Sequence, residues 1–354
     1  MMHMKKNNSD LASALPFDQY SRQLVVSTLI NDVFKKDKML EIIDLGGHKG
    51  KTHEFHPDDK ITIIDLFDEE YPGYVRGDAT NTKFADKQFD VAVSFDVFEH
   101  IPRSRRLPFI KEGLRISKQG MFIAMPVDDK LHTVSSAEVR LNRYHQSIFK
   151  EDHQWLKEHI DYRIPTEEEI TELVKKAGAY QISLSSNQIG DWQLLQMLIF
   201  SSASNPDITT DVEAINNWYN ENILDLDSSV DVGYRRIFFV TKDIQAYESV
   251  KKIIEKKSKT PPPSMTIHSR TFDKFSETLA NISRKYNDLY KAYGSLSDKQ
   301  RKIVELEKHI EELYAHNKKL TREIDTIYRS VSWKATRPFR AINKLKKLSQ
   351  KSDK

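Results

Sequence analysis

The hydrophobic pattern of the chain changes near residue 245. Before that point, short apolar runs that fit buried strands alternate with stretches in which apolar residues recur at helical spacing. The clearest runs are MLEIIDL, KITIIDL, FDVAVSF and GMFIAMP. Continuous apolar runs of this length, separated by helical stretches, are typical of a parallel sheet covered on both faces. We therefore predict a doubly wound α/β domain over residues 14–245.

Three further segments complete the predicted domain. FDQYSRQLVVSTLINDVF has its apolar residues on one side and is predicted to form the first helix. TEEEITELVKKAGAYQISLSS has the acidic first turn of a helix and ends as a strand. YRRIFFVTKD is predicted to be the final strand. Residues 1–13 precede the first helix, and we expect them to be disordered.

The domain is followed by a change in composition. The segment KKIIEKKSKTPPPS is rich in lysine and closes with three prolines from Pro261, which stiffen the chain. We expect residues 246–270 to be a linker. Residues 271–329 then have the seven-residue apolar repeat of an α-helical coiled coil, which is weaker in its first half.

The repeat is clearest from Ile303 onward. Isoleucine at position a with leucine at position d favours a parallel two-stranded coil, and a single asparagine at a fixes the register. We expect self-association as a dimer or trimer; the alternative is one helix folded back on the α/β domain. Positions a are Ile303, Ile310, Asn317 and Ile324, and positions d are Leu306, Leu313, Leu320 and Ile327.

The last segment, residues 330–354, is basic and contains interleaved apolar side chains such as Trp333 and Phe339. This pattern suits an interfacial helix on anionic lipid. We expect it to contact the inner face of the cytoplasmic membrane or a membrane-bound glycosyltransferase; a disordered, solvated terminus is the alternative. No nucleic-acid partner is expected, because the basic residues form one short segment outside any recognised binding module.

Composition adds a few constraints. The formal net charge of +3 is too small to argue for nucleic-acid binding. The absence of cysteine excludes disulfides, thiolate nucleophiles and cysteine-ligated zinc. No apolar run approaches membrane-spanning length, and the start MMHMKKNNSD lacks the apolar core of a signal peptide. We expect a cytoplasmic protein whose tail associates with a surface.

The loop EIIDLGGHKGKT follows the first strand and nearly matches two phosphate-binding motifs. It is one residue short of the G-x-x-x-x-G-K-[ST] loop that cradles triphosphates. In the dinucleotide motif G-x-G-x-x-G, His48 and Lys51 stand where the second and third glycines should be. Neither motif is complete, so other residues must identify the ligand.

Acidic residues follow the predicted strands, at the edge where ligands of such sheets bind. A triphosphate beside so many carboxylates would need Mg²⁺ to offset the repulsion. A ligand with a cationic amine and a ribose would suit carboxylates directly. The acids are Asp44, Asp65, Asp78 and Asp96.

The ordered segments EIIDLGGHKG, ITIID, GDAT, FDVAVSFDVFEHIP and GMFIAMP resemble those of class I S-adenosylmethionine-dependent methyltransferases. The resemblance covers about two thirds of the chain and implies a Rossmann-like domain with S-adenosylmethionine as cofactor. It departs at His48, which occupies the middle glycine of the usual D-x-G-x-G-x-G. The implied cofactor-binding residues are Asp44, Gly46, Gly47 and Gly50 at the methionine part, Asp65 at the ribose, Asp78 and Ala79 at the adenine, and Phe95 and Asp96 near the sulfonium.

Methyl transfer to a hydroxyl needs a base near the acceptor, and histidine is the usual base near neutral pH. His100 follows the third strand, in FEHIP; the alternative is that this residue pair only caps the next helix. His159 lies in WLKEHIDYRIP, within a long polar segment where such enzymes bind their acceptor. No metal is expected, because the two histidines of HEFH are too few ligands.

The tail also resembles the S-x-S-W-K-x-T-x-P-x-R end of bacterial surface-polysaccharide glycosyltransferases and their associated methyltransferases. That resemblance implies O-methylation of a sugar in a surface polysaccharide or its lipid-linked precursor. The alternative is a non-enzymatic coiled-coil scaffold with a degenerate methyltransferase domain in a polysaccharide assembly complex.

Overall fold

A computed structural model of the protein divides into two units, Met1–Pro263 and Ser264–Lys354, and each is described by itself. The described residues are 11–35, 38–130, 133–222, 233–258, 281–282, 284–285 and 300–327.

The first unit is built on a seven-stranded sheet in the order β3-β2-β1-β4-β5-β7-β6. The first five strands in this order are parallel, and β7 runs antiparallel to both of its neighbours. The predicted doubly wound α/β fold is thus confirmed, as a mixed sheet. The strands are β1 (Glu41–Leu45), β2 (Lys60–Asp65), β3 (Tyr74–Arg76), β4 (Val91–Phe95), β5 (Met121–Pro126), β6 (Tyr180–Gln188) and β7 (Gly233–Thr241).

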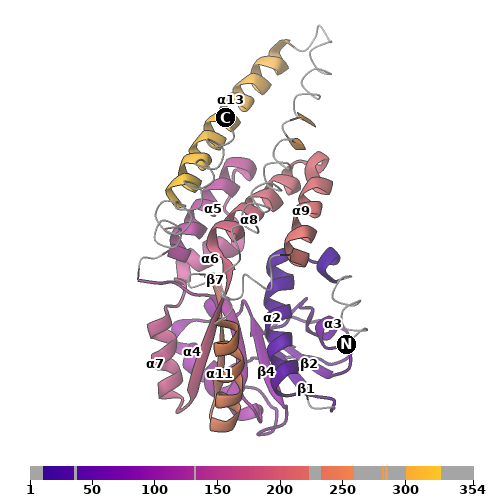
Figure 1. The fold of residues 1–354 in the computed structure, drawn as a ribbon, viewed down its shortest axis with the longest axis vertical. Helices are drawn as coiled ribbons and strands as arrows, with labels where there is room; N and C mark the ends of the chain where they lie inside the picture. The colour runs from indigo at the N-terminus through magenta and orange to yellow at the C-terminus, as the bar shows by residue number, and fades with distance from the viewer. Residues whose placement is uncertain are drawn as a thin grey trace, which may run out of the picture. The chain divides into compact units, whose positions relative to one another are not determined.

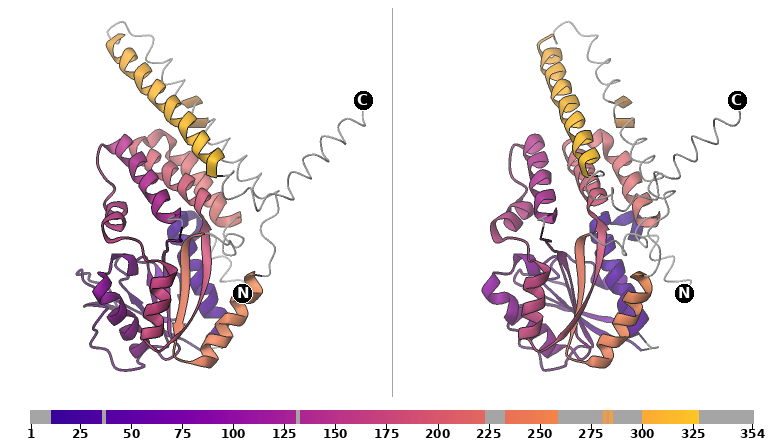
Figure 2. Two further views of the ribbon diagram at one scale, coloured as in Figure 1. Left: turned by 90° about the vertical axis from the view of Figure 1, so that its left-hand side faces the viewer. Right: turned by 60° about the vertical axis from the view of Figure 1, so that its left-hand side comes forward.

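Helices cover both faces of this sheet (Figures 1 and 2). One face packs against α2 (Phe17–Val33) and α11 (Ile244–Ser258), and the other against α4 (Arg103–Ile116) and α7 (Glu167–Lys176). Central strands β4 and β5 are therefore buried on both faces, which explains their uninterrupted apolar runs.

The helix α7 shows how local sequence sets an element's ends. The Thr166 side chain accepts a hydrogen bond from Glu169 N at 3.2 Å and so caps the first turn. Acidic residues lie in that first turn and lysines in the last, as the helix dipole favours. Ile170 and Val174, one turn apart, are buried against the sheet.

A second group of helices, which includes α5, α8 and α9, lies beyond one end of the sheet (Figure 1). Helix α5 packs against α6 and α8, α8 packs against α9, and α9 reaches α2. The polar segment expected to bind the acceptor supplies α5 and α6. The remaining elements of the first unit are α5 (Thr133–Phe149), α6 (Gln154–Tyr162), α8 (Ile189–Ser204), α9 (Thr209–Asn222), the short helix α3 (Thr52–Phe55) and the 3₁₀ turns η1 (Phe98–His100) and η2 (Pro206–Ile208).

Two expected boundaries of the domain differ from the structure. The predicted linker over 246–270 begins with α11, because Ala246, Val250 and Ile254 recur at helical spacing and are buried against the sheet. At the other end, Leu11 and Ala12 are buried, although residues 1–13 were expected to be disordered. Both segments are rich in polar residues, and in the described part of each a few apolar side chains pack against the domain.

In the second unit, the seven-residue repeat from Ile303 lies on one helix, α13 (Gln300–Ile327). Leu313 is 38% exposed, and Ile310 and Leu320 are half-buried. The coiled coil itself, as an association of chains, stays a prediction. Most of the weaker half of the predicted coil and the whole tail, residues 330–354, lie outside the described residues. Among the helices the structure describes, none is both long enough and apolar enough to span a membrane.

Candidate active site

The glycine loop joins the end of β1 to α3. Gly46 has a φ of 83°, and its N–H donates to the Ile64 carbonyl at 2.8 Å. A Cβ at Gly46 would lie 2.6 Å from the Val97 side chain, so only glycine fits both the backbone angle and the space. The other left-handed residue of the loop is Lys49, with a φ of 55°. His48 is not among the left-handed residues, so its place in the glycine motif requires no strained angle.

His48 instead ties the loop to the end of β2. Its backbone N–H donates to Asp65 Oδ2 at 3.1 Å. Its ring lies against Phe67, with centroids 4.9 Å apart, and its Nδ1 lies 3.6 Å from Glu69. The loop and the expected ribose-binding acid are thereby held together, although the middle glycine is absent.

Asp44, at the end of β1, is a buried carboxylate with one unused oxygen. Thr52 Oγ1 donates to its Oδ2 at 2.6 Å, while Oδ1 has no hydrogen-bond partner among the described residues. Burial raises the pKa of Asp44 to about 7, against the opposing effect of the Thr52 hydrogen bond. An unsatisfied buried acid beside a glycine loop fits the cationic amino group of S-adenosylmethionine, so these residues suit the expected cofactor.

Asp65 and Asp78 end their strands nearby. Asp65 Oδ1 accepts a hydrogen bond from Phe67 N at 3.3 Å, which orients the carboxylate. Asp78 is paired with Arg105 and accepts two hydrogen bonds from Thr80. Burial opposes ionisation of Asp78, but these donors lower its pKa below the ordinary value.

Sequence reasoning missed the two apolar side chains that follow Asp65. Leu66 is 64% exposed and Phe67 is 63% exposed, directly after a buried strand. Large exposed apolar side chains beside a ribose-binding acid could cover a purine ring. The available signal was that the apolar run KITIIDLF continues past the acid that ends the strand.

Asp96, expected near the sulfonium, is held by two arginines. It has a φ of 51° and lies at the end of β4. Arg22 of α2 and Arg235 of β7 both pair with its carboxylate. Burial opposes ionisation, but the two cations lower the pKa of Asp96 well below its usual range, so it stays charged.

The two remaining expected cofactor residues are apolar. Phe95 and Ala79 are partly buried and pack at the margins of the two apolar cores. The arginines at Asp96 were missed, because they lie 74 and 139 residues away in the chain.

The structure brings together the two histidines selected from the sequence. His100 Nε2 and His159 Nε2 lie 3.2 Å apart, although 59 residues separate them in the chain. Each ring is backed by a carboxylate: His159 Nδ1 lies 2.9 Å from Glu138 Oε1, and His100 Nδ1 lies 3.0 Å from Glu158 Oε2. We refer to these four residues and Glu99 as the histidine cluster.

Glu99 is the most isolated member of the cluster. It is 1% exposed, and neither carboxylate oxygen has a hydrogen-bond partner among the described residues. His159 Nε2 lies 3.9 Å from Glu99 Oε1. Burial, followed by the charge of Asp96, raises the pKa of Glu99 to about 8.

The Glu138 side chain is held in place by a tyrosine of the sheet. Tyr234 of β7 donates its hydroxyl to Glu138 Oε1 at 2.7 Å. Tyr234 in turn stacks on Trp192 of α8, with ring centroids 3.5 Å apart and an interplanar angle of 10°. Four elements therefore position the cluster: η1, α5, α6 and β7.

The two histidines titrate differently. Burial disfavours the charged form of His159, but the hydrogen bond and charge of Glu138, together with Glu99 and Asp96, raise its pKa to about 9. Burial and the neighbouring His159 lower the pKa of His100 below its ordinary value. Near neutral pH, His159 is therefore charged and its Nε2–H donates to a neutral His100.

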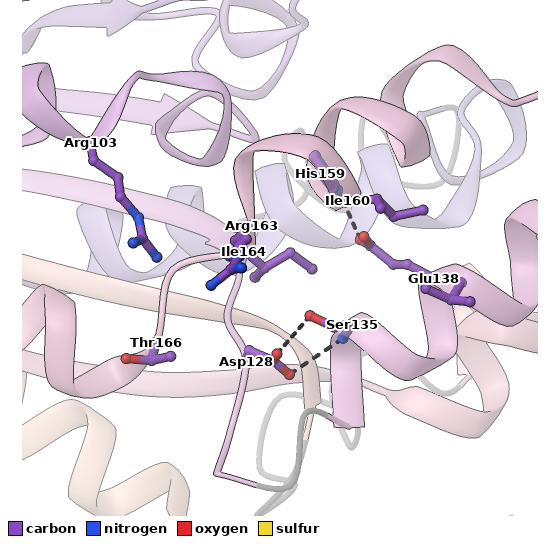
Figure 3. A pocket seen from close by; sticks show the side chains of 10 residues that line it. Arg103, Asp128, Ser135, Glu138, His159, Ile160, Arg163, Ile164 and Thr166 are labelled. Atoms are coloured by element: carbon purple, nitrogen blue, oxygen red, sulfur yellow. Dashed lines mark hydrogen bonds and ion pairs between the residues drawn. The ribbon is translucent and has the colours of Figure 1, made fainter.

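A cavity of about 390 Å³ adjoins the cluster. Figure 3 shows Glu138 directed toward His159 and Asp128 bonded to Ser135, whose hydroxyl donates to Asp128 Oδ2 at 2.6 Å. Most of the lining residues have polar or charged side chains, of both signs, but most of the surface that faces the cavity is apolar. Its residues are Arg103, Asp128, Ser135, Glu138, Val139, His159, Ile160, Arg163, Ile164 and Thr166.

Residues 58–125 match the family model described as a methyltransferase domain. The match runs from β2 through β5 and includes Asp65, Asp78, Asp96 and His100. The match covers about a fifth of the chain and agrees with the predicted methyltransferase domain over those residues. A search of curated proteins found no relative that matches this sequence.

Several solved structures are similar to part of the chain. The YcgJ protein of Bacillus subtilis shares 14% identity over 63% of this chain and 99% of its own, with a TM-score of 0.38. The 1,6-didemethyltoxoflavin-N1-methyltransferase of Burkholderia thailandensis, solved with S-adenosylhomocysteine, shares 11% identity over 62% of this chain and 78% of its own, with a TM-score of 0.36. At these TM-scores the fold assignment rests on the strand order described above.

Proposed function

We propose that this methyltransferase, which uses S-adenosylmethionine, methylates a hydroxyl of a sugar in a bacterial surface polysaccharide or its lipid-linked precursor. The observation that carries the proposal is the histidine cluster beside a cavity lined by charged side chains of both signs, at the carboxyl end of the sheet. A hydroxyl acceptor needs a proton acceptor, and the cluster offers a neutral imidazole close to where the acceptor would lie.

In the proposed reaction, the cofactor supplies a methyl group on a positively charged sulfur, which is a good leaving group. The acceptor oxygen would form a bond to the methyl carbon while the carbon–sulfur bond breaks. The electron pair of the broken bond would stay on sulfur. The hydroxyl proton passes to His100 Nε2, which gives up its hydrogen bond from His159 Nε2–H in order to accept it. Glu158, 3.0 Å from His100 Nδ1, would stabilise the charged imidazole that results. The protein otherwise acts by holding the two reactants in line.

The cavity favours a polyol as the acceptor. Its lining combines carboxylate, hydroxyl and guanidinium groups, which can bind several hydroxyls at once. On α6, Trp155 is 60% exposed and Tyr162 is 51% exposed, so aromatic faces for a sugar ring lie on the same helix as His159. The resemblance of the tail to polysaccharide enzymes supports the same acceptor class.

We further infer that residues 271–329 self-associate and that the tail, residues 330–354, contacts anionic lipid or a membrane-bound glycosyltransferase. Both inferences rest on the sequence pattern, and an oligomeric coil would place several tails together and raise their avidity. Sedimentation velocity on the full chain and on a truncation before Pro261 tests the first inference. A monomer in both samples contradicts it.

Calorimetry with S-adenosylmethionine tests the cofactor half of the proposal. Asp65→Ala should weaken binding by about 100-fold, because a ribose loses its acceptor for two hydroxyl hydrogens. The matched control is Asp68→Ala, on the same loop, where the side chain is 74% exposed and pairs only with Arg76 at the surface. Asp68→Ala should bind like the wild type.

Two outcomes separate the enzyme from the alternative of a non-enzymatic scaffold. If the wild type binds no cofactor and Asp65→Ala is indistinguishable from it, the scaffold is favoured. If the cofactor binds, mass spectrometry of surface glycan from a deletion strain tests the acceptor. The strain's glycan should lack one O-methyl group per modified sugar, and an unchanged glycan would exclude this acceptor.

A further inference from the structure

Three potential metal ligands of the histidine cluster point toward one another. Glu99, His100 and His159 each offer a ligand atom, and these atoms all lie within 4.8 Å of one another. The three residues come from η1 and α6, which the fold brings into contact. The sequence-based expectation of no metal considered only His53 and His56, which do not take part in this group.

We propose that Glu99, His100 and His159 form a binding site for one divalent transition-metal ion. The proposal rests on three independent features of the described residues: the spacing of the ligand atoms, the carboxylate behind each histidine, and the unsatisfied buried carboxylate of Glu99.

The spacing suits a common metal. Two ligand atoms at about 2.1 Å from Zn²⁺ lie roughly 3.0–3.4 Å apart when the angle between them is about 90–109°. The two Nε2 atoms are already 3.2 Å apart. Glu99 Oε1 lies 3.9 Å from His159 Nε2, and all three ligand atoms lie within 4.8 Å of one another, so a side-chain movement of about 1 Å would complete the set.

The surroundings of both histidines match those of metal ligands. A metal-bound imidazole typically donates its other ring N–H to a carboxylate, which fixes the ring and the tautomer. Here His159 Nδ1 faces Glu138 and His100 Nδ1 faces Glu158, at 2.9 and 3.0 Å. Both Nε2 atoms are then left for an ion, which would replace the 3.2 Å hydrogen bond between them. Tyr234 holds Glu138 in place by a 2.7 Å hydrogen bond.

Glu99 provides an observation that the histidines alone do not. A carboxylate that is 1% exposed and accepts no hydrogen bond among the described residues is costly unless something pairs with it. The arginines Arg22 and Arg235 do not serve as its partners, because they pair with Asp96. A divalent cation between Glu99 and the two Nε2 atoms would satisfy it.

Two imidazoles and one carboxylate suit Zn²⁺, Mn²⁺ or Fe²⁺, and such three-ligand sites keep positions open for an oxygen from outside the protein. His159 lines the cavity, so an acceptor bound there could reach an open position. That role rests on the proposed function, whereas metal binding does not. A histidine nitrogen that binds the ion cannot also accept a proton, so activity could rise or fall when the metal binds. Metal binding itself is therefore the appropriate measurement.

The test uses the full chain, stripped with a chelator and dialysed, and titrated by calorimetry with ZnCl₂ and separately with MnCl₂. We expect one ion per chain for at least one of the two metals. Glu99→Gln and His159→Asn should each lower the affinity at least about 100-fold, and Glu138→Gln about 10- to 100-fold. The metal should also raise the unfolding temperature of the wild type and not that of Glu99→Gln.

The matched control is His53→Gln, which removes a histidine whose side chain is 57% exposed and lies outside the cluster. It should bind metal like the wild type. If Glu99→Gln does not fold, His100→Gln replaces it, because that side chain is 25% exposed. The proposal is overturned if neither metal binds, or if the cluster variants bind as tightly as His53→Gln. Neither result depends on cofactor binding or on the acceptor.

Discussion

The two ends of the candidate site each contain a buried acid, but they are built differently. At the glycine loop, Asp44 is bonded to Thr52, eight residues away in the chain. In the histidine cluster, the residues around Glu99 come from α5, α6 and β7, up to more than a third of the chain away. The first end is assembled from neighbouring sequence and backbone hydrogen bonds, and the second from tertiary contacts. The comparison predicts that the second end is the more sensitive to distant substitutions.

The largest effect should follow from removing Arg235, which ties β7 to Asp96. Arg235 is 1% exposed, and it donates to Asp96 Oδ1 at 2.9 Å and to Asn187 Oδ1 at 2.8 Å. Arg235→Met should lower the free energy of unfolding by about 3 kcal/mol, because it leaves Asp96 Oδ1 without its donor and removes one of the two cations that pair with this carboxylate. Urea unfolding of the first unit measures the change.

A like pair at the adenine end provides the contrast. Arg105 pairs with Asp78, but their side chains are 47% and 36% exposed. Arg105→Met should therefore lower stability by no more than about 1 kcal/mol. For the buried pair, adding Asp96→Asn to Arg235→Met should restore part of the free energy of unfolding that Arg235→Met loses. Equal costs for the two arginine substitutions would break the comparison.

A smaller effect concerns pH and the cofactor. The pKa of Asp44 is about 7, so the carboxylate is ionised above that pH and neutral below it. Only the ionised form attracts a cationic amine, so binding of S-adenosylmethionine should weaken as pH falls from 7.5 to 5.5. Below pH 7 the dissociation constant should rise up to about 10-fold per unit, which is about 1.4 kcal/mol. Calorimetry at several pH values measures the slope.

Asp44→Asn is the control for this titration. It should bind more weakly than the wild type at pH 7.5, and its affinity should be nearly independent of pH. A slope that persists in Asp44→Asn would assign the pH dependence to another group and remove Asp44 from the amine site.

The smallest effect is a local one within the glycine loop. Lys49 has a left-handed φ of 55°, which is strained for a residue with a Cβ. Lys49→Gly should raise the free energy of unfolding by about 0.5 kcal/mol, since relief of strain exceeds the entropy that glycine adds to the unfolded chain. Lys51→Gly, at a φ of −114°, should lower it. Thermal unfolding that ranks the two variants in the opposite order would contradict this account of the loop.

The sequence predicted the elements of the fold better than their arrangement. The apolar runs match β1, β2, β4 and β5 to within two residues, because parallel strands buried on both faces leave an uninterrupted signal. The position of β7 between β5 and β6 had no such signal, since strand order depends on contacts far apart in the chain.

The candidate site divides in the same way. The strand-ending acids at the glycine loop could be selected one by one, because each follows its own strand. His100 and His159 could also be selected, but nothing local predicts that their Nε2 atoms meet. Glu99 was overlooked, because a glutamate before a histidine at a strand end reads as part of a helix cap, and its burial appears only in the folded chain.

The place of β7 has a consequence for how the protein is made. This strand is synthesised last in the sheet, yet it pairs with both β5 and β6. Met121 of β5, for example, can pair on that side only after Val240 of β7 has been synthesised. Until residue 241 has left the ribosome, two strands keep open edges that invite wrong pairing. Contacts of such long range also slow folding. Because Tyr234 and Arg235 arrive on this strand, a nascent chain that stops short of it has no completed active site.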